Sequence, residues 1–318
     1  MDKSFLITTG NQHQYVYSDA LCYFLYVPEE MATVMEHMDA SLVDRTNYYE
    51  RKLKYLKEHC FFEKREVTFQ TDYSEELVKR NLAGLRQLLI EVTDRCNLEC
   101  KYCGYGEFYS NYDRRETGDQ SFENVKLLVD YLTKLWCSDY NVSHKNEITI
   151  GFYGGEPLLN MKLVKETIAY IESLNLPSLI FNYNTTTNAM LLDRYMDYLV
   201  EKNFSILISL DGNEVQSAYR VDKHGNSSFS RVVRNVKKLQ ETYPDYFEKK
   251  VNFNSVLHDK NSVDQIYSYI KTNFDKTPYI SELNRNGIAE DKKEEFNRMF
   301  HSKEDSIKQA VNLSLIHI

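Results

Sequence analysis

The stretch Ile90–Tyr105, IEVTDRCNLECKYCGY, contains three cysteines with the spacing C-x3-C-x2-C, at Cys96, Cys100 and Cys103. The run before it, LRQLLIEVT, is apolar and is followed by polar residues, which predicts a buried strand. We therefore expect the cysteines on a loop that leaves the carboxyl end of this strand.

Three thiolates on one short loop can hold three iron corners of a cubane cluster, and a fourth cysteine would close it. With three cysteines, one iron has no protein ligand and can bind a small molecule. The alternatives are a zinc site with a distant histidine, or unrelated thiols. Zinc ligands usually come as two pairs, but Cys22, Cys60 and Cys137 are isolated. A disulfide framework is disfavoured in a long chain without a secretory signal.

The composition is that of a globular protein long enough for two domains, with 318 residues, 42% hydrophobic and 27% charged. The net charge is −8, and basic residues are interspersed with acidic ones, so we expect no nucleic-acid partner. No apolar run is long enough to cross a bilayer, and the amino terminus lacks a signal-peptide core. The sequence predicts a cytoplasmic protein, where thiolates stay reduced.

Residues 1–85 predict a small α+β domain. The segments Ser4–Thr9 and Gln14–Tyr17 flank a GNQH turn, which favours a hairpin. A strand that ends at Pro28 precedes a helix, and Thr46–Cys60 predicts a second helix.

From residue 86 onward, predicted strands and helices alternate with short connections, which favours a parallel sheet with helices outside it. Loops with a function lie at the carboxyl ends of strands in such sheets. The expected strands are Leu85–Thr93, Glu147–Phe152, Leu179–Thr186, Phe204–Leu210, Lys250–Leu257 and Tyr279–Leu283, and the expected helices are Phe122–Trp136, Met161–Leu174, Leu191–Lys202, Ser230–Thr242 and Val263–Phe274.

Gly154, Gly155 and Glu156 follow the second predicted strand, in FYGGEP. Two glycines allow close backbone approach and unusual torsions, and the glutamate adds a carboxylate. Taken alone, GGEP is also ordinary turn material.

Polar residues also follow the next two strands. Thr185–Asn188 ends the third strand, where a helix cap is an alternative interpretation. Ser209 and Asp211 end the fourth strand, and Arg220 follows. A hydroxyl can bind a ribose and a guanidinium can pair with a carboxylate, although Asp-Gly is also a turn signal.

The cysteine motif, with Tyr102 before its last cysteine, resembles the cluster motif of the radical S-adenosylmethionine (radical SAM) enzymes, and GGEP matches another motif of that family. The resemblance implies an α/β fold, a partial (β/α)6 barrel, in which Cys96, Cys100 and Cys103 hold a [4Fe–4S] cluster. In that family SAM chelates the open iron, and reductive cleavage of its sulfonium gives a 5′-deoxyadenosyl radical that abstracts hydrogen from a substrate.

The same resemblance implies that the GGEP motif holds the amino group of SAM. Ser209, Asp211 and Arg220 resemble residues that contact the ribose and carboxylate of SAM in the peptide- and sulfatase-maturing branch. Ala189 stands where the family often has a glycine, which argues against a glycine-dependent turn there. The sequence identifies no general acid or base.

Longer segments, such as FYGGEPLLNM and VNFNSVLHDKNS, resemble bacterial enzymes that mature small precursor peptides with repeated cysteines. This implies modification of a ribosomally made peptide by a side-chain crosslink, such as a thioether, with a flavodoxin or ferredoxin as electron donor. Residues 1–85 would bind the leader of that peptide or form a structural cap. The alternatives are maturation of a sulfatase, or a non-catalytic peptide-binding module that holds zinc or a cluster.

Enzymes of this branch normally continue into a cysteine-rich domain, whereas no cysteine follows Cys137 here. The last six residues, Leu313–Ile318, resemble the translation of a transposon adapter used in sequencing libraries. We therefore expect a radical SAM barrel over residues 86–312 and a native chain that was cut short near Asn312. A genuine short apolar strand is the alternative for the tail.

Overall fold

The computed structural model describes residues 5–18, 21–36, 48–63, 73–110, 118–142 and 146–312. The chain divides into two compact units, Met1–Asp72 and Tyr73–Ile318. This division falls earlier than the predicted boundary at residue 85 because helix α3 (Glu75–Ala83) packs against helix α4 (Phe122–Trp136) of the second unit. The predicted tail, Leu313–Ile318, lies outside the described residues.

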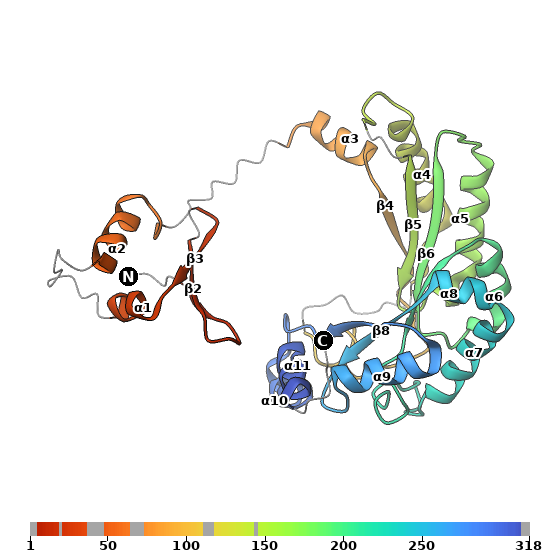
Figure 1. Ribbon diagram of the computed structural model, residues 1–318. Helices are drawn as coiled ribbons and strands as arrows, with labels where there is room; N and C mark the ends of the chain where they lie inside the picture. Colours follow the sequence, from red (N-terminus) through yellow and green to blue (C-terminus); the bar gives the residue numbers. More distant parts are fainter. Residues whose placement is uncertain are drawn as a thin grey trace. The chain divides into compact units, whose positions relative to one another are not determined.

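The first unit is a three-stranded antiparallel sheet with two helices (Figure 1). The predicted hairpin is confirmed, since the first two strands pair around the GNQH turn, and a third strand pairs with the second. Val16, Val27, Met31 and Leu53 form a core that joins the sheet to both helices. The elements are β1 (Phe5–Thr8), β2 (Gln14–Ser18), β3 (Tyr23–Val27), α1 (Glu29–Glu36) and α2 (Tyr48–Glu58).

The second unit is built on six parallel strands in the order β4-β5-β6-β7-β8-β9. Consecutive strands pair, and in the described part of the chain β4 and β9 are the two edges. The predicted α/β fold, a partial (β/α)6 barrel, is therefore confirmed, since the six described strands form one parallel sheet that does not close. The strands are β4 (Gln87–Thr93), β5 (Glu147–Gly154), β6 (Ile180–Thr187), β7 (Ser205–Ser209), β8 (Val251–Leu257) and β9 (Tyr279–Glu282).

Helices cover one face of this sheet (Figure 1). In α4 the hydroxyl of Ser121 accepts a bond from the Asn124 amide at 3.2 Å, which caps the first turn. Val125, Val129 and Leu132 of this helix face the core. The other helices are α5 (Met161–Ser173), α6 (Leu192–Glu201), α7 (Phe229–Thr242), α8 (Pro244–Lys250), α9 (Val263–Phe274), α10 (Lys293–Met299) and α11 (Lys303–Asn312), with 3-10 turns η1 (Pro157–Asn160) and η2 (Glu290–Lys292).

The two faces of the sheet differ because successive side chains of a strand point to opposite sides. Ile150, Ile208 and Phe253 are fully buried under the helices, and burial of each such side chain contributes roughly 1.5–3 kcal/mol. On the inner face, Asn252 beside Phe253 is exposed, and Thr149 and Leu207 are half-buried. No helix among the described residues is long and apolar enough to cross a membrane.

The turn after β6 forms with alanine in place of glycine. Ala189 is fully buried and has a φ of 59°, in the left-handed region that costs most L-residues roughly 1–2 kcal/mol. The expected loss of this turn is therefore not observed. The surrounding contacts hold the alanine in a conformation that a glycine would adopt without strain.

Replacing Ala189 with glycine relieves that strain but adds freedom to the unfolded chain and removes a buried methyl group. We expect Ala189→Gly to raise the free energy of unfolding by about 0.5–1 kcal/mol, measured by urea denaturation. A loss of stability would contradict this account of the turn. Ala83→Gly, in helix α3, is the control and should destabilise the protein.

Candidate functional site

The three predicted cysteines line one cavity of about 310 Å³ at the carboxyl ends of the strands. Cys96, Cys100 and Cys103 lie on the loop after β4, as the sequence predicted. Gly154, Gly155 and Glu156 line the same cavity from the loop after β5. Two motifs that lie far apart in the sequence therefore meet at one site.

The three thiols line this cavity at separate positions and do not converge on one metal-ion position. In the part of the chain that the structure describes, no three His, Cys, Asp or Glu side chains are placed to hold one metal ion. A cubane cluster binds three thiolates through three separate irons, and three thiols that line one cavity are compatible with that arrangement. Burial raises the pKa of the Cys100 thiol to about 12, and bound iron would reverse this effect by stabilising the thiolate.

The GGEP backbone packs directly against the cysteine loop. The Gly155 amide donates to the Thr93 carbonyl, and the Glu156 amide donates to the Arg95 carbonyl, both at 2.8 Å. A Cβ on Gly154 would lie 2.1 Å from the Thr93 oxygen, and one on Gly155 would lie 2.2 Å from the Arg95 oxygen. Only glycine fits at either position, and Gly154 also has a φ of 129°.

The Glu156 carboxylate ties the loops after β5 and β6 together. It accepts bonds from the Leu158 amide at 3.0 Å, the Thr187 hydroxyl at 2.7 Å and the Asn188 amide at 2.8 Å. Its residue is only 1% exposed. Burial raises the pKa of Glu156 to about 7, although the three donors act in the opposite direction.

Asn188 links the loop after β6 to the first cysteine. Its side-chain N–H donates to the side-chain oxygen Oδ1 of Asn97 at 2.8 Å, and the same nitrogen lies 3.7 Å from the sulfur of Cys96. Its carbonyl oxygen accepts the amide of Met190 at 3.0 Å. Asn188 thus stabilises the turn after β6, but it does not cap helix α6, whose N-cap residue Leu191 makes no side-chain cap bond, so the alternative interpretation as a helix cap is wrong.

Asp211 lies behind the cavity wall and binds protein groups. Its carboxylate accepts two bonds from Arg220, at 3.0 and 2.9 Å, one from the Val256 amide at 2.9 Å, and one from the hydroxyl of Tyr102. Burial alone would raise the pKa of Asp211, but Arg220 and the other donors lower it to about 2. Ser209 and Arg220 line the cavity, whereas Asp211 does not. Asp211 is fully buried and bonded to protein groups, and its role as a SAM contact stays a prediction.

Sequence reasoning missed several residues around this network. His258 is fully buried, with Nε2 3.8 Å from Asp211, and its ring stacks on Tyr102. Glu282 and Asn284 line the cavity at the end of β9. Their place at strand ends was a usable signal, but the sequence did not show which of them face inward.

A sequence model of the Radical SAM superfamily matches residues 90–272, more than half of the chain. The chain belongs to the radical SAM superfamily. Members of this superfamily use a [4Fe–4S] cluster and SAM, and these are its cofactors. The cysteine loop and the GGEP loop both lie within the matched residues, and both line the cavity. The family match therefore covers the two motifs that form this site.

Curated relatives of this radical SAM chain include two named enzymes. The cysteine-type anaerobic sulfatase-maturating enzyme of Clostridium novyi is 27% identical over 194 residues, 60% of this chain and 49% of the relative. The radical SAM cyclopropyl synthase TigE of Paramaledivibacter caminithermalis is 24% identical over 198 residues, 60% of this chain and 40% of the relative. The chain spans less than half of each.

The solved structure of native anSMEcpe with bound AdoMet has a similar fold, with a TM-score of 0.51 and 22% identity. The similarity covers 73% of this chain and 63% of that one. The same enzyme has also been solved with AdoMet and the Cp18Cys peptide.

Asp211 offers a test of the buried network. Removing one partner of a buried ion pair leaves an unpaired charge, so Asp211→Leu should lower the free energy of unfolding by about 3–5 kcal/mol. The double variant Asp211→Leu, Arg220→Met should recover part of that loss, since no charge remains buried. Urea denaturation of all three proteins measures this, and equal stability of the single and double variants would contradict it.

Glu156 predicts a pH dependence of the cofactor-free protein. The folded state keeps the proton up to about pH 7, whereas the unfolded state releases it near its ordinary pKa of about 4.3. The contribution of Glu156 is therefore full below that value and is lost as pH rises to 7, by up to roughly 4 kcal/mol at 1.36 kcal/mol for each pH unit. Urea denaturation at pH 4.5 and 8 should show a smaller fall for Glu156→Gln than for the unchanged protein; equal falls would refute the assignment.

Proposed function

We propose that this chain contains the catalytic core of a radical SAM enzyme that modifies a ribosomally made peptide. The observation that carries the proposal is the convergence of Cys96, Cys100 and Cys103 with the GGEP loop on one cavity. When bound there, the cluster and SAM supply a radical that abstracts a hydrogen atom from a substrate.

The residues of the chain have distinct proposed tasks at this cavity. The three cysteines hold the cluster. Gly154 and Gly155 bring the main chain close to the cysteine loop, so that it and Glu156 can bind the amino group of SAM. Ser209 and Arg220 face the cavity and contact the ribose and the carboxylate of SAM. Two of the five N–H donors of Arg220, on Nε and Nη2, bind Asp211, which fixes the orientation of the guanidinium.

Peptide modification is supported by the named relatives, a sulfatase-maturating enzyme and a cyclopropyl synthase, and by the peptide in the anSMEcpe structure. We propose a side-chain crosslink of the thioether type, with an electron donor such as flavodoxin or ferredoxin. Sulfatase maturation is the second candidate, because the similarity to a cysteine-type sulfatase-maturating enzyme covers 60% of the chain.

We further propose that the first unit binds the leader of the substrate peptide. In its sheet β3 lies at an edge, where an added strand can pair with free backbone groups. Phe24 and Tyr26 on this strand are 55% and 49% exposed. A structural cap remains the other interpretation of residues 1–85.

Cofactor loading tests the proposed core. After anaerobic reconstitution with iron and sulfide, the unchanged protein should hold roughly four irons and form 5′-deoxyadenosine from SAM and dithionite. Cys96→Ala should lose both properties, and Cys137→Ala, at an exposed cysteine outside the cavity, should keep both.

Zinc in place of iron, or a cluster that forms no 5′-deoxyadenosine with SAM, would support the non-catalytic module and overturn the proposal.

A further inference from the structure

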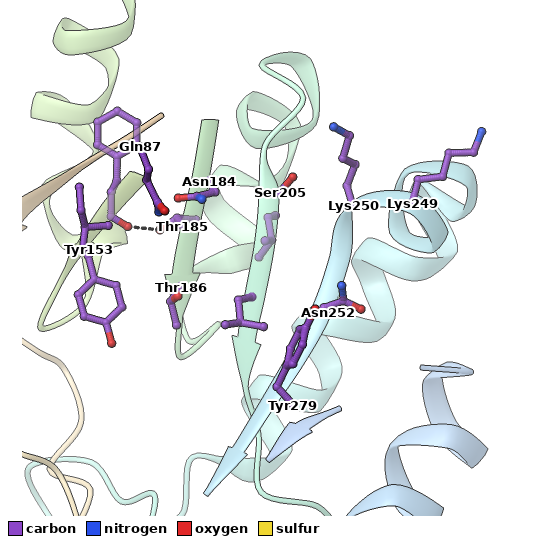
Figure 2. Close-up of a pocket in the computed structure, with 14 residues that line it drawn as sticks. Gln87, Tyr153, Asn184, Thr185, Thr186, Ser205, Lys249, Lys250, Asn252 and Tyr279 are labelled. Carbon is purple, nitrogen blue, oxygen red and sulfur yellow. Dashed lines mark hydrogen bonds between the residues drawn. The ribbon is translucent and has the colours of Figure 1, made fainter. Parts of the chain in front are cut away.

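A second cavity, of about 510 Å³, lies on the inner face of the sheet toward the amino ends of the strands (Figure 2). Its volume is in the range of about 300–1,000 Å³ that is typical of ligand pockets. Side chains from all six strands of the sheet line it, among them Gln87, Asn184, Ser205, Asn252 and Tyr279.

Gly151 of β5 lies against Leu89 and Asn184, two residues that line this second cavity. A Cβ there would lie 2.6 Å from the Asn184 side-chain oxygen and 2.7 Å from a methyl carbon of Leu89. Glycine within a strand often marks a place where other groups come close to the backbone. At this position glycine lets the side chains of Leu89 and Asn184 approach the backbone of β5.

The amide and hydroxyl groups that line the cavity have unused bonding capacity. Among the described residues, the side chains of Asn184, Asn252 and Ser205 form no hydrogen bond to another residue. Each carboxamide offers donors and an acceptor, and the hydroxyl offers both. This set matches the alternating N–H and C=O groups of an extended peptide better than it matches an apolar ligand.

The lining of the cavity is positively charged near the amino ends of the strands. Lys249 and Lys250, at the end of α8, belong to the lining, and no Asp or Glu does. Neither lysine forms an ion pair with a described residue. Figure 2 shows Lys250 at the start of β8 and Lys249 beside it on α8, with both amine ends extending away from the other labelled residues. A ligand with a carboxylate at this end would meet two free cations.

The second cavity adjoins the cysteine cavity, because Tyr153 and Thr186 line both. Along β7, Ser205 lines the second cavity and Ser209 lines the cysteine cavity. At about 3.3 Å per residue these positions are roughly 13 Å apart, the length of about four residues of extended peptide.

We propose that this second cavity is a subsite for the substrate peptide, which binds an extended segment with an acidic side chain at Lys249 and Lys250. The acidic residue would lie about four positions from the residue that is modified at the cysteine cavity. This inference rests on the proposed function and specifies the class of peptide that the site accepts.

The test uses the reconstituted full chain with SAM bound and four fluorescein-labelled pentapeptides. Two carry cysteine and glutamate at opposite ends, Cys-Ala-Ala-Ala-Glu and Glu-Ala-Ala-Ala-Cys, and two carry glutamine in place of glutamate. Fluorescence anisotropy should show that one glutamate peptide binds roughly tenfold more tightly than its glutamine match, as one bond to a charged group provides.

The double variant Lys249→Gln, Lys250→Gln should lose this preference. The matched control Lys237→Gln, Lys238→Gln changes two exposed lysines on the outer helix α7 and should keep it. Asn184→Leu should weaken both peptides of the pair. Circular dichroism checks that each variant is folded.

Equal binding of glutamate and glutamine peptides to the unchanged protein, or a preference that survives in the Lys249, Lys250 variant, would overturn the inference. Formation of 5′-deoxyadenosine by the same unchanged preparation separates the two proposals. If it occurs without a glutamate preference, only the subsite fails; if it does not occur, the proposed function fails.

Discussion

The buried carboxylate of Asp211 connects the cysteine loop to the far half of the sheet. It joins Tyr102 between two cysteines, Arg220 in the loop after β7, and the backbone of β8 at Val256. A buried carboxylate without these partners would cost free energy. The position of Asp211 therefore depends on the cysteine loop, the loop after β7 and strand β8 together. Glu156 does the same between the loops after β5 and β6. Two buried acids thus hold the loops that form the cavity.

The sheet explains why two cavities lie on one face. Parallel strands with helices on one side bury an apolar outer face and leave the other face open. In this chain the described inner-face residues are largely polar, as Asn184, Ser205 and Asn252 illustrate. The carboxyl ends carry cysteines and a glycine turn, and the amino ends carry two lysines. The two ends of one face therefore carry different chemistry, on which the proposed binding of an extended peptide rests.

Much of this fold could be predicted from the sequence. The helices Phe122–Trp136 and Val263–Phe274 have the predicted bounds, because their apolar periodicity and caps act locally. The helix α8 was missed, since Pro244 begins a short helix directly after a longer one. The division of the chain was placed too late because packing of α3 against α4 depends on contacts that no local pattern records.

Within the site, motifs predicted which residues come together but not which of them face the cavity. Ser209 and Asp211 are two residues apart on one strand end, yet one lines the cavity and the other is buried behind it. The alanine at position 189 predicted a changed turn, whereas tertiary contacts hold it at a glycine-like φ. Pairing of buried groups and backbone strain are properties of the folded chain, so the sequence alone could not reveal them.

The central claim is that three cysteines leave one iron of a cluster open to SAM. Electron paramagnetic resonance of the reduced, reconstituted protein tests it most directly, recorded with and without SAM. The account predicts the signal of a reduced [4Fe–4S] cluster whose spectrum changes when SAM is added. A spectrum that is unaffected by SAM, or a protein that takes up zinc and gives no signal, would contradict it.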